Sequence, residues 1–294
     1  IAVLPFAVAH CVYSVVCRRM ICRDVSANIQ IMLTIYGRKR PTFVWCISKK
    51  EVKNMPLMRL DKFISSQLTD VSRSEVKNLC KRGYVCVDGK PARSSDIKID
   101  PEASRVTVGD REISYKKNLY IMLNKPAGVV CATRDGLSAT VLELLPPEFR
   151  RSGLFPAGRL DKDTEGFTLI TDDGELAHRM LSPKSHVPKK YFVRLEKPLD
   201  GTEARLFSEG IVLEDGTKCL PAELEAGDKA NECFVIIHQG MYHQVKRMFE
   251  AVGNSVVYLK RVMIGGLALD PELAVGKARE LADFEVEKLV LGKK

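Results

Sequence analysis

The chain has 294 residues, of which 45% are hydrophobic and 28% are charged, a balance that excludes a fibrous or wholly disordered protein. It contains no run of about 18 uncharged apolar residues, so we expect no membrane-spanning helix. The nine cysteines include no C-x-x-C pair and the five histidines complete no zinc-ligand pattern, so we predict free thiols, no metal site and a reducing, cytoplasmic setting.

The net charge of +9 is unevenly distributed along the chain. Residues 1–57 have nine Lys/Arg against two Asp/Glu, and residues 58–118 have thirteen against nine. Residues 119–294 have twenty-four against twenty-six, so they carry a net charge of −2. The basic excess of the N-terminal two fifths predicts a module that binds a polyanion, attached to a near-neutral body.

Residues 1–57 differ from the remainder, because regular helical or strand periodicity begins only after Pro56. The apolar run that starts at Ile1 precedes the basic residues, which is the reverse of a secretory signal. We expect a disordered extension or a start assigned too far upstream, with Met55 or Met58 as the natural beginning. An organelle transit peptide, or an RNA-binding arm at "GRKRP", are the alternatives.

Residues 58–104 are predicted to form a small basic domain. The stretch "RLDKFISSQL" places its apolar residues on one face of a helix. A second helix is predicted in "SRSEVKNLCKRG", where Ser72 and Glu75 form a capping box and Gly83 ends the helix. The alternating "YVCVDGKPA" predicts a hairpin that turns at Asp88–Gly89. We expect residues 105–118 to be a linker.

The second predicted helix has a basic outer face, which suits either an RNA backbone or simple solvation. The order of the elements resembles the S4 RNA-binding domain (α-L type) over about 45 residues. This resemblance implies that the basic side chains contact RNA, whereas Asp61 faces the helix dipole and is structural. The predicted RNA-binding residues are Arg59, Lys62, Arg73, Lys77, Lys81 and Arg82.

Residues 119–294 mix strands and helices without regular alternation, which predicts an α+β body with a largely antiparallel sheet. "LYIMLNKPAGVVCAT" predicts a strand, a turn and a second strand, and "DGLSATVLELLP" predicts a helix. In "GRLDKDTEGFTLIT", the segment between Gly158 and Gly166 lacks helical spacing and is predicted to be a loop that leads into a strand. Functional side chains often lie in such loops.

The sequence has no phosphate-binding, dinucleotide-binding, zinc-protease or serine-hydrolase motif. What remains is the carboxylate of Asp161 in the glycine-bounded loop, with Arg159 two residues before it. A carboxylate that must stay ionised in a dry pocket needs a cationic neighbour, which Arg159 or Lys246 could provide. Tyr191 could stack on an extruded base. From residue types alone, a surface ion pair and a core tyrosine are the more common explanations of this pattern.

"PAGRLDKDTEGFTLITDDG", "KKYFV" and "GMYHQVKRMFEAVGNSVVYLKRVMIGG" resemble the motifs of RNA pseudouridine synthases, in the branch that carries an S4 domain. With the S4 match, the resemblance covers residues 58 to about 290. It implies an isomerase that converts uridine to pseudouridine with no cofactor and no metal. Asp161 then corresponds to the catalytic aspartate, whereas Asp163 falls on a variable position and is expected to be a solvated charge.

The resemblance also implies supporting roles for other residues. Arg159 would pair with Asp161 and help to displace the target base, and Tyr191 would stack under the uracil. Lys246 would keep Asp161 ionised. Two further residues, Leu259 and Ile264, would help to line the pocket.

The string "YHQVKRMF" is most similar to small-subunit ribosomal enzymes of this branch, the RsuA type. It implies one uridine of 16S ribosomal RNA as the substrate, in a partly assembled small subunit. Nothing in the sequence suggests an obligate dimer, so we expect a cytoplasmic monomer. One alternative is a large-subunit (23S) synthase of the same branch. The other is a non-catalytic S4-type RNA-binding or ribosome assembly factor.

Overall fold

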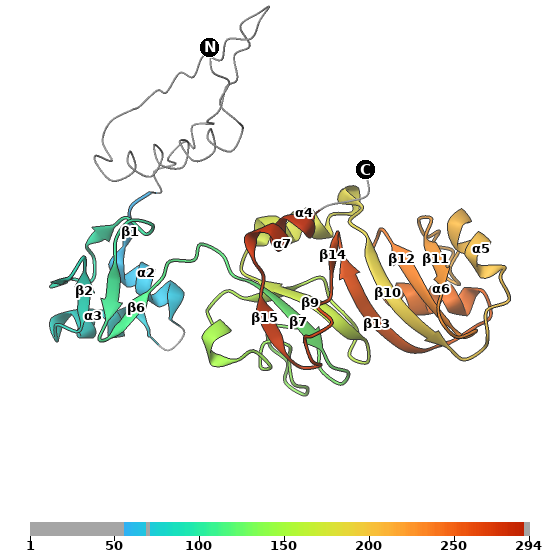
Figure 1. Ribbon diagram of the computed structural model, residues 1–294, viewed down its shortest axis with the longest axis horizontal. Coiled ribbons are helices and arrows are strands. Elements are labelled where there is room, and N and C mark those ends of the chain that lie inside the picture. The colour runs from blue at the N-terminus through green and yellow to red at the C-terminus, as the bar shows by residue number, and fades with distance from the viewer. Residues whose placement is uncertain (1–55, 69–70, 291–294) are drawn as a thin grey trace, which may run out of the picture. The chain divides into compact units, whose positions relative to one another are not determined.

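The computed structural model describes residues 56–68 and 71–290 (Figure 1). The prediction of a separate extension at residues 1–57 therefore falls almost wholly outside the described residues. None of the helices in the described part of the chain is long and apolar enough to cross a membrane.

The first folded domain contains two helices, α2 (Leu60–Gln67) and α3 (Arg73–Lys81). A short strand pair joins β1 (Met58–Arg59) to β4 (Lys98–Ile99). A four-stranded antiparallel sheet has the order β3-β2-β5-β6. Its strands are β2 (Val85–Val87), β3 (Lys90–Pro91), β5 (Val106–Val108) and β6 (Arg111–Ile113).

Local sequence signals explain these elements. The predicted apolar face of α2 is fully buried at Leu60, Phe63 and Ile64. The hydroxyl of Ser72 caps α3 by accepting a hydrogen bond from the backbone N–H of Glu75. The predicted hairpin is confirmed, because β2 and β3 pair across a two-residue turn at 88–89 in which both residues have positive φ.

The predicted linker at 105–118 is wrong for its first part. Residues 106–113 form β5 and β6, and β5 pairs with β2. Val106 and Ile113 are buried in the core of this domain. Each of the two strands has only three residues, so their alternation is too short to be recognised in the sequence. The first domain therefore extends to Ile113.

The second domain is built on one sheet, nine-stranded within the described residues, with the order β11-β12-β10-β13-β9-β7-β15. In addition, β14 pairs with β13 and β8 pairs with β9. The strands are β7 (Tyr120–Lys125), β8 (Phe155–Ala157), β9 (Glu165–Thr171), β10 (Lys189–Leu195), β11 (Glu223–Ala226), β12 (Glu232–Ile237), β13 (Val256–Ile264), β14 (Leu267–Ala268) and β15 (Ala278–Glu280).

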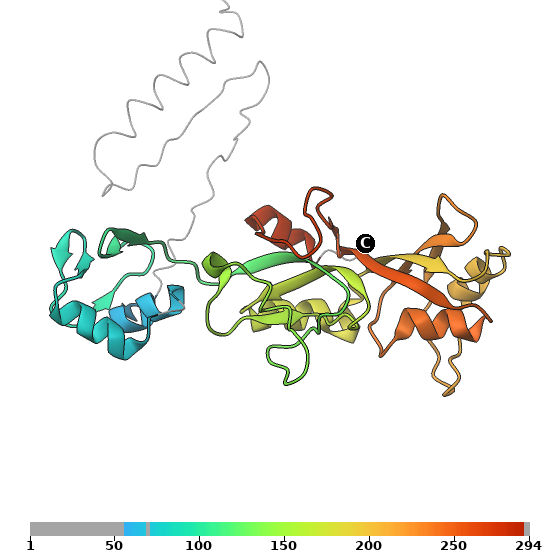
Figure 2. The same cartoon turned by 90° about the horizontal axis from the view of Figure 1, so that it is seen from below.

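Pairing in this sheet is antiparallel except between β13 and β9, which are parallel. The predicted α+β architecture with a largely antiparallel sheet is therefore confirmed. The strands β10 and β13 are long and curved, and they join the part of the sheet that contains β7 and β9 to the part that contains β11 and β12 (Figures 1 and 2).

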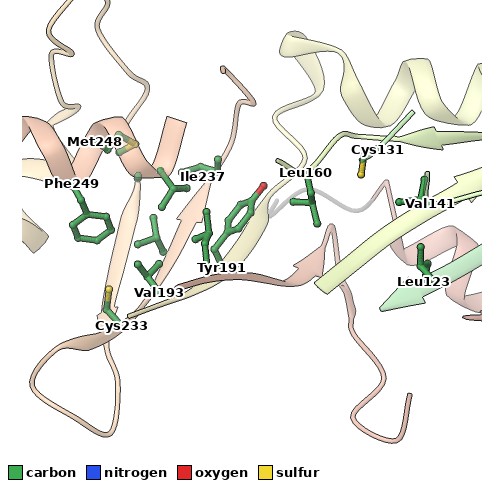
Figure 3. Packing of buried hydrophobic residues seen from close by; sticks show 14 of the residues in the cluster. Leu123, Cys131, Val141, Leu160, Tyr191, Val193, Cys233, Ile237, Met248 and Phe249 are labelled. Carbon is green, nitrogen blue, oxygen red and sulfur yellow. The ribbon is translucent and has the colours of Figure 1, made fainter. Parts of the chain in front are cut away.

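The helices of this domain are α4 (Gly174–Leu181), α5 (Glu203–Glu209), α6 (Gln244–Ala251) and α7 (Asp283–Lys288), with 3-10 turns at Pro147–Phe149 and Pro183–Ser185. The inner stripe predicted for α6 is confirmed, since Val245, Met248 and Phe249 are buried in the larger hydrophobic cluster. Figure 3 shows Met248 and Phe249 in this cluster beside Val193 and Cys233.

Two predictions between β7 and β8 are wrong. The second strand expected after the Pro126 turn is reduced to a single bridge between Val130 and Thr140. The helix expected over 135–145 is instead a series of bends followed by a turn at 141–144. The N–H of Val130 donates to the carbonyl oxygen of Ala139, and the N–H of Val141 donates to that of Val130, so this backbone pairs across the loop and not along a helix.

Candidate active site

The loop that carries Asp161 runs between β8 and β9 and is pinned at its C-terminal end by a close backbone approach. Gly166 pairs with Arg261 of β13. A Cβ atom at Gly166 would lie 2.2 Å from the carbonyl oxygen of Arg261, and the residue has a φ of +101°. Glycine is therefore required at this position by both space and conformation.

A buried lysine holds the backbone of the same loop. The side chain of Lys125 is fully buried at the end of β7, and burial lowers its pKa. Its ammonium donates to four carbonyl oxygens at 2.7–3.2 Å, those of Pro126, Asp161, Lys162 and Thr164. Lys125 thus fixes the main chain on which the Asp161 carboxylate is mounted.

Arg261 holds both ends of the loop. It is 1% exposed, and its Nε donates to the carbonyl oxygen of Phe167 at 2.7 Å. Its Nη2 donates to the carbonyl oxygen of Gly158 at 2.9 Å. A buried guanidinium that binds two backbone carbonyls satisfies acceptors that β9 and its preceding loop would otherwise leave unpaired.

Two cationic or ionisable groups from the start of α6 face the carboxylate of Asp161. Lys246 Nζ lies 3.6 Å from Oδ2, and His243 Nε2 lies 3.5 Å from Oδ1. The Asp161 side chain is 29% exposed. Both distances are longer than hydrogen bonds, and that of the Lys246 ammonium corresponds to a short-range ion pair. The predicted proximity of Lys246 to Asp161 is present in the structure.

Lys246 makes its closest contact with a second carboxylate. Its ammonium hydrogen-bonds both oxygens of Asp163, at 2.7 and 2.8 Å. This hydrogen bond lowers the pKa of Asp163. Asp163 is 72% exposed, in keeping with the solvated charge expected for it, but it is also the main partner of Lys246.

Arg159 does not pair with Asp161. It is exposed and makes no hydrogen bond or ion pair with any residue that the structure describes. Leu160, between the two residues, is buried in the larger hydrophobic cluster. The groups that approach the carboxylate of Asp161 come from the α6 segment instead.

Tyr191 lies on β10 and is 7% exposed. It belongs to the same hydrophobic cluster as Leu160 and Leu259. Figure 3 shows its ring within this cluster, with the hydroxyl end on the side of Leu160. Leu259 thus lies in the apolar surroundings of Tyr191, whereas Ile264 is buried in the second cluster, with α4 and α7.

A cavity of about 450 Å³ opens at the carboxylate, within the size range of small-ligand sites. It is lined by Ala127, Gly128, Asp161, Lys162, Asp163, His243 and Lys246. No group of three or more His, Cys, Asp or Glu side chains in the described part of the chain is arranged to hold a metal ion. The cavity presents the carboxylates of Asp161 and Asp163 beside two lysine ammonium groups and the imidazole of His243.

Sequence reasoning missed Lys125, Arg261 and His243. Lys125 had one visible signal, since a lysine directly after an apolar strand is unusual unless its charge finds buried partners. Arg261 and His243 had no comparable signal, because their partners come from distant segments of the chain.

The six basic residues predicted in the first domain differ in their environment. Arg59 binds Asp61 through two hydrogen bonds, and this interaction lowers the pKa of Asp61. The other five are exposed, and their side chains make no hydrogen bond or ion pair within the described residues; they are Lys62, Arg73, Lys77, Lys81 and Arg82. Four of these five lie on or directly after α3.

Comparison with known proteins assigns both domains. Residues 58–111 match the S4 domain, and residues 119–251 match the family described as RNA pseudouridylate synthase. A crystal structure of a pseudouridylate synthase aligns with a TM-score of 0.56 and 37% identity, over 79% of this chain and 99% of that one. The two domains therefore define an S4-containing, RNA-modifying isomerase.

Relatives from bacteria extend over the same region. The chain is 48% identical to the uncharacterised RNA pseudouridine synthase YtzG of Bacillus subtilis, over 79% of this chain and 98% of the relative. It is 43% identical to ribosomal small subunit pseudouridine synthase A of Escherichia coli, over 79% of this chain and 100% of the relative. The chain belongs to the RNA pseudouridine synthase family.

Proposed function

We propose that this enzyme converts one specific uridine of small-subunit (16S) ribosomal RNA to pseudouridine, with Asp161 as the catalytic carboxylate. The observation that carries the proposal is the position of Asp161. It sits on a loop braced by Lys125 and Arg261, opens onto a cavity, and has Lys246 and His243 within 4 Å of its oxygens. The small-subunit target is supported by the relatives from Escherichia coli and Vibrio cholerae.

The reaction breaks the bond between uracil N1 and C1′ of the ribose, rotates the base and joins C5 to C1′. C5 loses its proton and N1 gains one, so no electrons and no external group are consumed. Asp161 acts by attacking C1′, by attacking the base or by removing a sugar proton. In each route the carboxylate reacts as an anion, and the ammonium of Lys246 at 3.6 Å stabilises that charge by Coulomb attraction.

The supporting residues take distinct parts in this proposal. In this proposal the displaced uracil stacks against Tyr191 and Leu259, which belong to the buried cluster that contains Leu160 and lie outside the residues that line the cavity. Arg159 is exposed and without a partner among the described residues, so its guanidinium is available to RNA. It displaces the target base from its stack and is positioned by the RNA rather than by Asp161.

The S4 domain supplies affinity through the exposed basic face of α3, which contacts phosphates without reading sequence. Lys62 and Arg59 add charge at the start of α2. The binding energy of these contacts offsets the few kcal/mol needed to extrude the uridine. We propose a cytoplasmic monomer that acts on partly assembled small subunits.

The target is tested with transcripts of small- and large-subunit ribosomal RNA that contain 5-tritiated uridine. Incubation with the full chain releases tritium when C5 is joined to the ribose, and mapping of pseudouridine then locates the site. Modification at one position of the small-subunit RNA is expected. Modification of the large-subunit RNA alone would support the 23S alternative, and binding without tritium release from either RNA would support a non-catalytic binder.

A further inference from the structure

Next to the cavity, two aromatic rings are stacked and exposed to solvent. The ring centroids of Tyr242 and His243 are 3.8 Å apart, with an interplanar angle of 17°. Tyr242 is 76% exposed, the highest value among the large aromatic side chains of the described residues. His243 lines the cavity. A tyrosine held flat on one neighbour leaves a planar surface free for a second planar group.

The residues on both sides of the pair are anchored. Met241 packs against the larger hydrophobic cluster, and Val245 is buried in it. The side chain of Gln244 is buried and accepts a hydrogen bond from the N–H of Met241 at 3.1 Å. The chain is therefore fixed before and after the two rings, so they are presented on a rigid support.

The backbone of His243 has an uncommon conformation. Its φ of 49° lies in the left-handed region, which few residues other than glycine adopt and which is found often at functional sites. With this conformation, His243 Nε2 lies 3.5 Å from the Asp161 carboxylate while its ring lies against Tyr242. The pair thus extends from the catalytic carboxylate to the solvent.

The surroundings of the pair favour a nucleotide as the occupant. Lys162 and Lys246 line the same cavity, and the exposed Arg159 precedes Asp161 by two residues. Planar rings beside cations are the combination that binds single-stranded nucleic acid, with bases on the rings and phosphates at the charges. We propose that Tyr242 and His243 form a stacking platform for an unpaired base of the RNA that adjoins the modified uridine. This inference rests on the proposed function.

If the two rings form a platform, removing the Tyr242 ring should lower the affinity for RNA and leave kcat nearly unchanged. Stacking of one base on an aromatic ring corresponds to roughly a 5- to 150-fold change in affinity. Tyr242→Ala is therefore expected to raise KM for the RNA by that factor and to leave kcat within about threefold. Tyr242→Phe is expected to behave like the unaltered chain, because the stacking surface does not need the hydroxyl group.

The experiment measures kcat and KM of the full chain and its variants on the small-subunit RNA transcript. The matched control is Phe284→Ala on α7, because Phe284 is also exposed, at 63%, but lies outside the cavity lining. Its KM should not change. A second measurement places 2-aminopurine on either side of the mapped uridine, where binding should quench the fluorescence with Tyr or Phe at position 242 but not with Ala.

The outcomes separate this inference from the proposed function. An unaltered chain that forms no pseudouridine in the transcripts or in partly assembled small subunits would overturn both. An active chain whose KM is unchanged by Tyr242→Ala, or whose Tyr242→Phe variant is as impaired as Tyr242→Ala, would overturn the platform alone. A loss of kcat without a change in KM would contradict it as well, and would indicate a role in chemistry instead.

Discussion

The ammonium of Lys246 lies between two carboxylates and is closer to Asp163, at 2.7 Å, than to Asp161, at 3.6 Å. The two contacts differ in their surroundings, because the Asp163 side chain is 72% exposed and that of Asp161 is 29% exposed. Exposed ion pairs contribute only about 0–1 kcal/mol, so the loss of the closer contact, between Lys246 and Asp163, should cost little stability.

This arrangement predicts unequal effects of removing Asp163 and Lys246. Asp163→Asn is expected to keep kcat within about threefold, since Lys246 then remains available to Asp161. Lys246→Met removes the cation nearest to Oδ2 and should lower kcat by at least tenfold. Tritium release at saturating RNA measures both. Equal losses in the two variants would show that the Asp163 contact is itself required.

Gly166→Ala is predicted to destabilise the second domain. The new Cβ would lie 2.2 Å from the carbonyl oxygen of Arg261, on a backbone with positive φ. Overpacking against backbone typically costs about 1–3 kcal/mol or more. Gly174→Ala is the matched control, because a Cβ there meets no atom within 4 Å and α4 begins at this residue. Thermal unfolding should show a lower midpoint for Gly166→Ala and an unchanged or slightly higher one for Gly174→Ala.

Lys189 predicts a specific dependence of stability on pH. Burial lowers its pKa to about 8 from 10.5. Between these two values the unfolded state binds the proton and the folded state does not, so this residue makes stability rise as pH increases from about 8 to 10.5. Below pH 8 both states are protonated, and the cost of the buried ammonium is constant.

In the unaltered chain, Lys189 should raise the denaturant midpoint of unfolding as the pH increases from 8 to 9.5. Lys189→Met should lack this rise. Tyr120 and Tyr258, whose pKa values burial raises from 10.0 to about 12, contribute the opposite slope above this window, and Cys233, raised from 9.0 to about 12, contributes it already within the window. These contributions are common to both proteins and cancel in their difference. Denaturant unfolding at several pH values measures the difference between the two proteins. Parallel pH profiles would show that Lys189 titrates in the folded state as it does in the unfolded chain.

The basic face of α3 is predicted to bind RNA through phosphates. Lys77→Ala combined with Lys81→Ala should weaken RNA binding and reduce the slope of log K against log salt by about 0.7–0.9 for each phosphate that is no longer neutralised. Arg105→Ala is the control, since Arg105 pairs with Glu112 within the same domain. Binding isotherms at several salt concentrations measure the slopes. A slope unchanged by the double substitution would mean that the RNA does not bind this face.

The sequence predicted those parts of the fold that short-range chemistry determines. The apolar face of α2 and the Asp88–Gly89 turn follow from residue spacing and from backbone preference, and both are present. The strands at 106–113 and the turns at 135–145 were predicted incorrectly. Three-residue strands carry almost no periodicity, and the backbone at 139–141 pairs with Val130, a distant contact that the local pattern does not indicate.

The candidate site could be predicted from the sequence to a smaller extent than the fold. Residue types suggested Arg159 or Lys246 as the cation beside Asp161, and only the resemblance to a known family assigned this role to Lys246, because nothing local in the sequence indicates that α6 packs beside the loop. Lys125 and Arg261 act on backbone carbonyls contributed by other segments, and these carbonyls converge only in the folded chain. The predicted Arg159 contact with Asp161 is absent because Arg159 is exposed, whereas Lys246 and His243 approach the carboxylate.

The central claim is that the carboxylate of Asp161 performs the chemistry while other residues provide affinity. Its most direct test is to measure RNA binding and tritium release for Asp161→Asn beside Asp163→Asn, two matched substitutions in one loop. Asp161→Asn should bind the transcript with the affinity of the unaltered chain and release no tritium. Asp163→Asn should bind the transcript and also release tritium. Measurable turnover by Asp161→Asn would contradict the account.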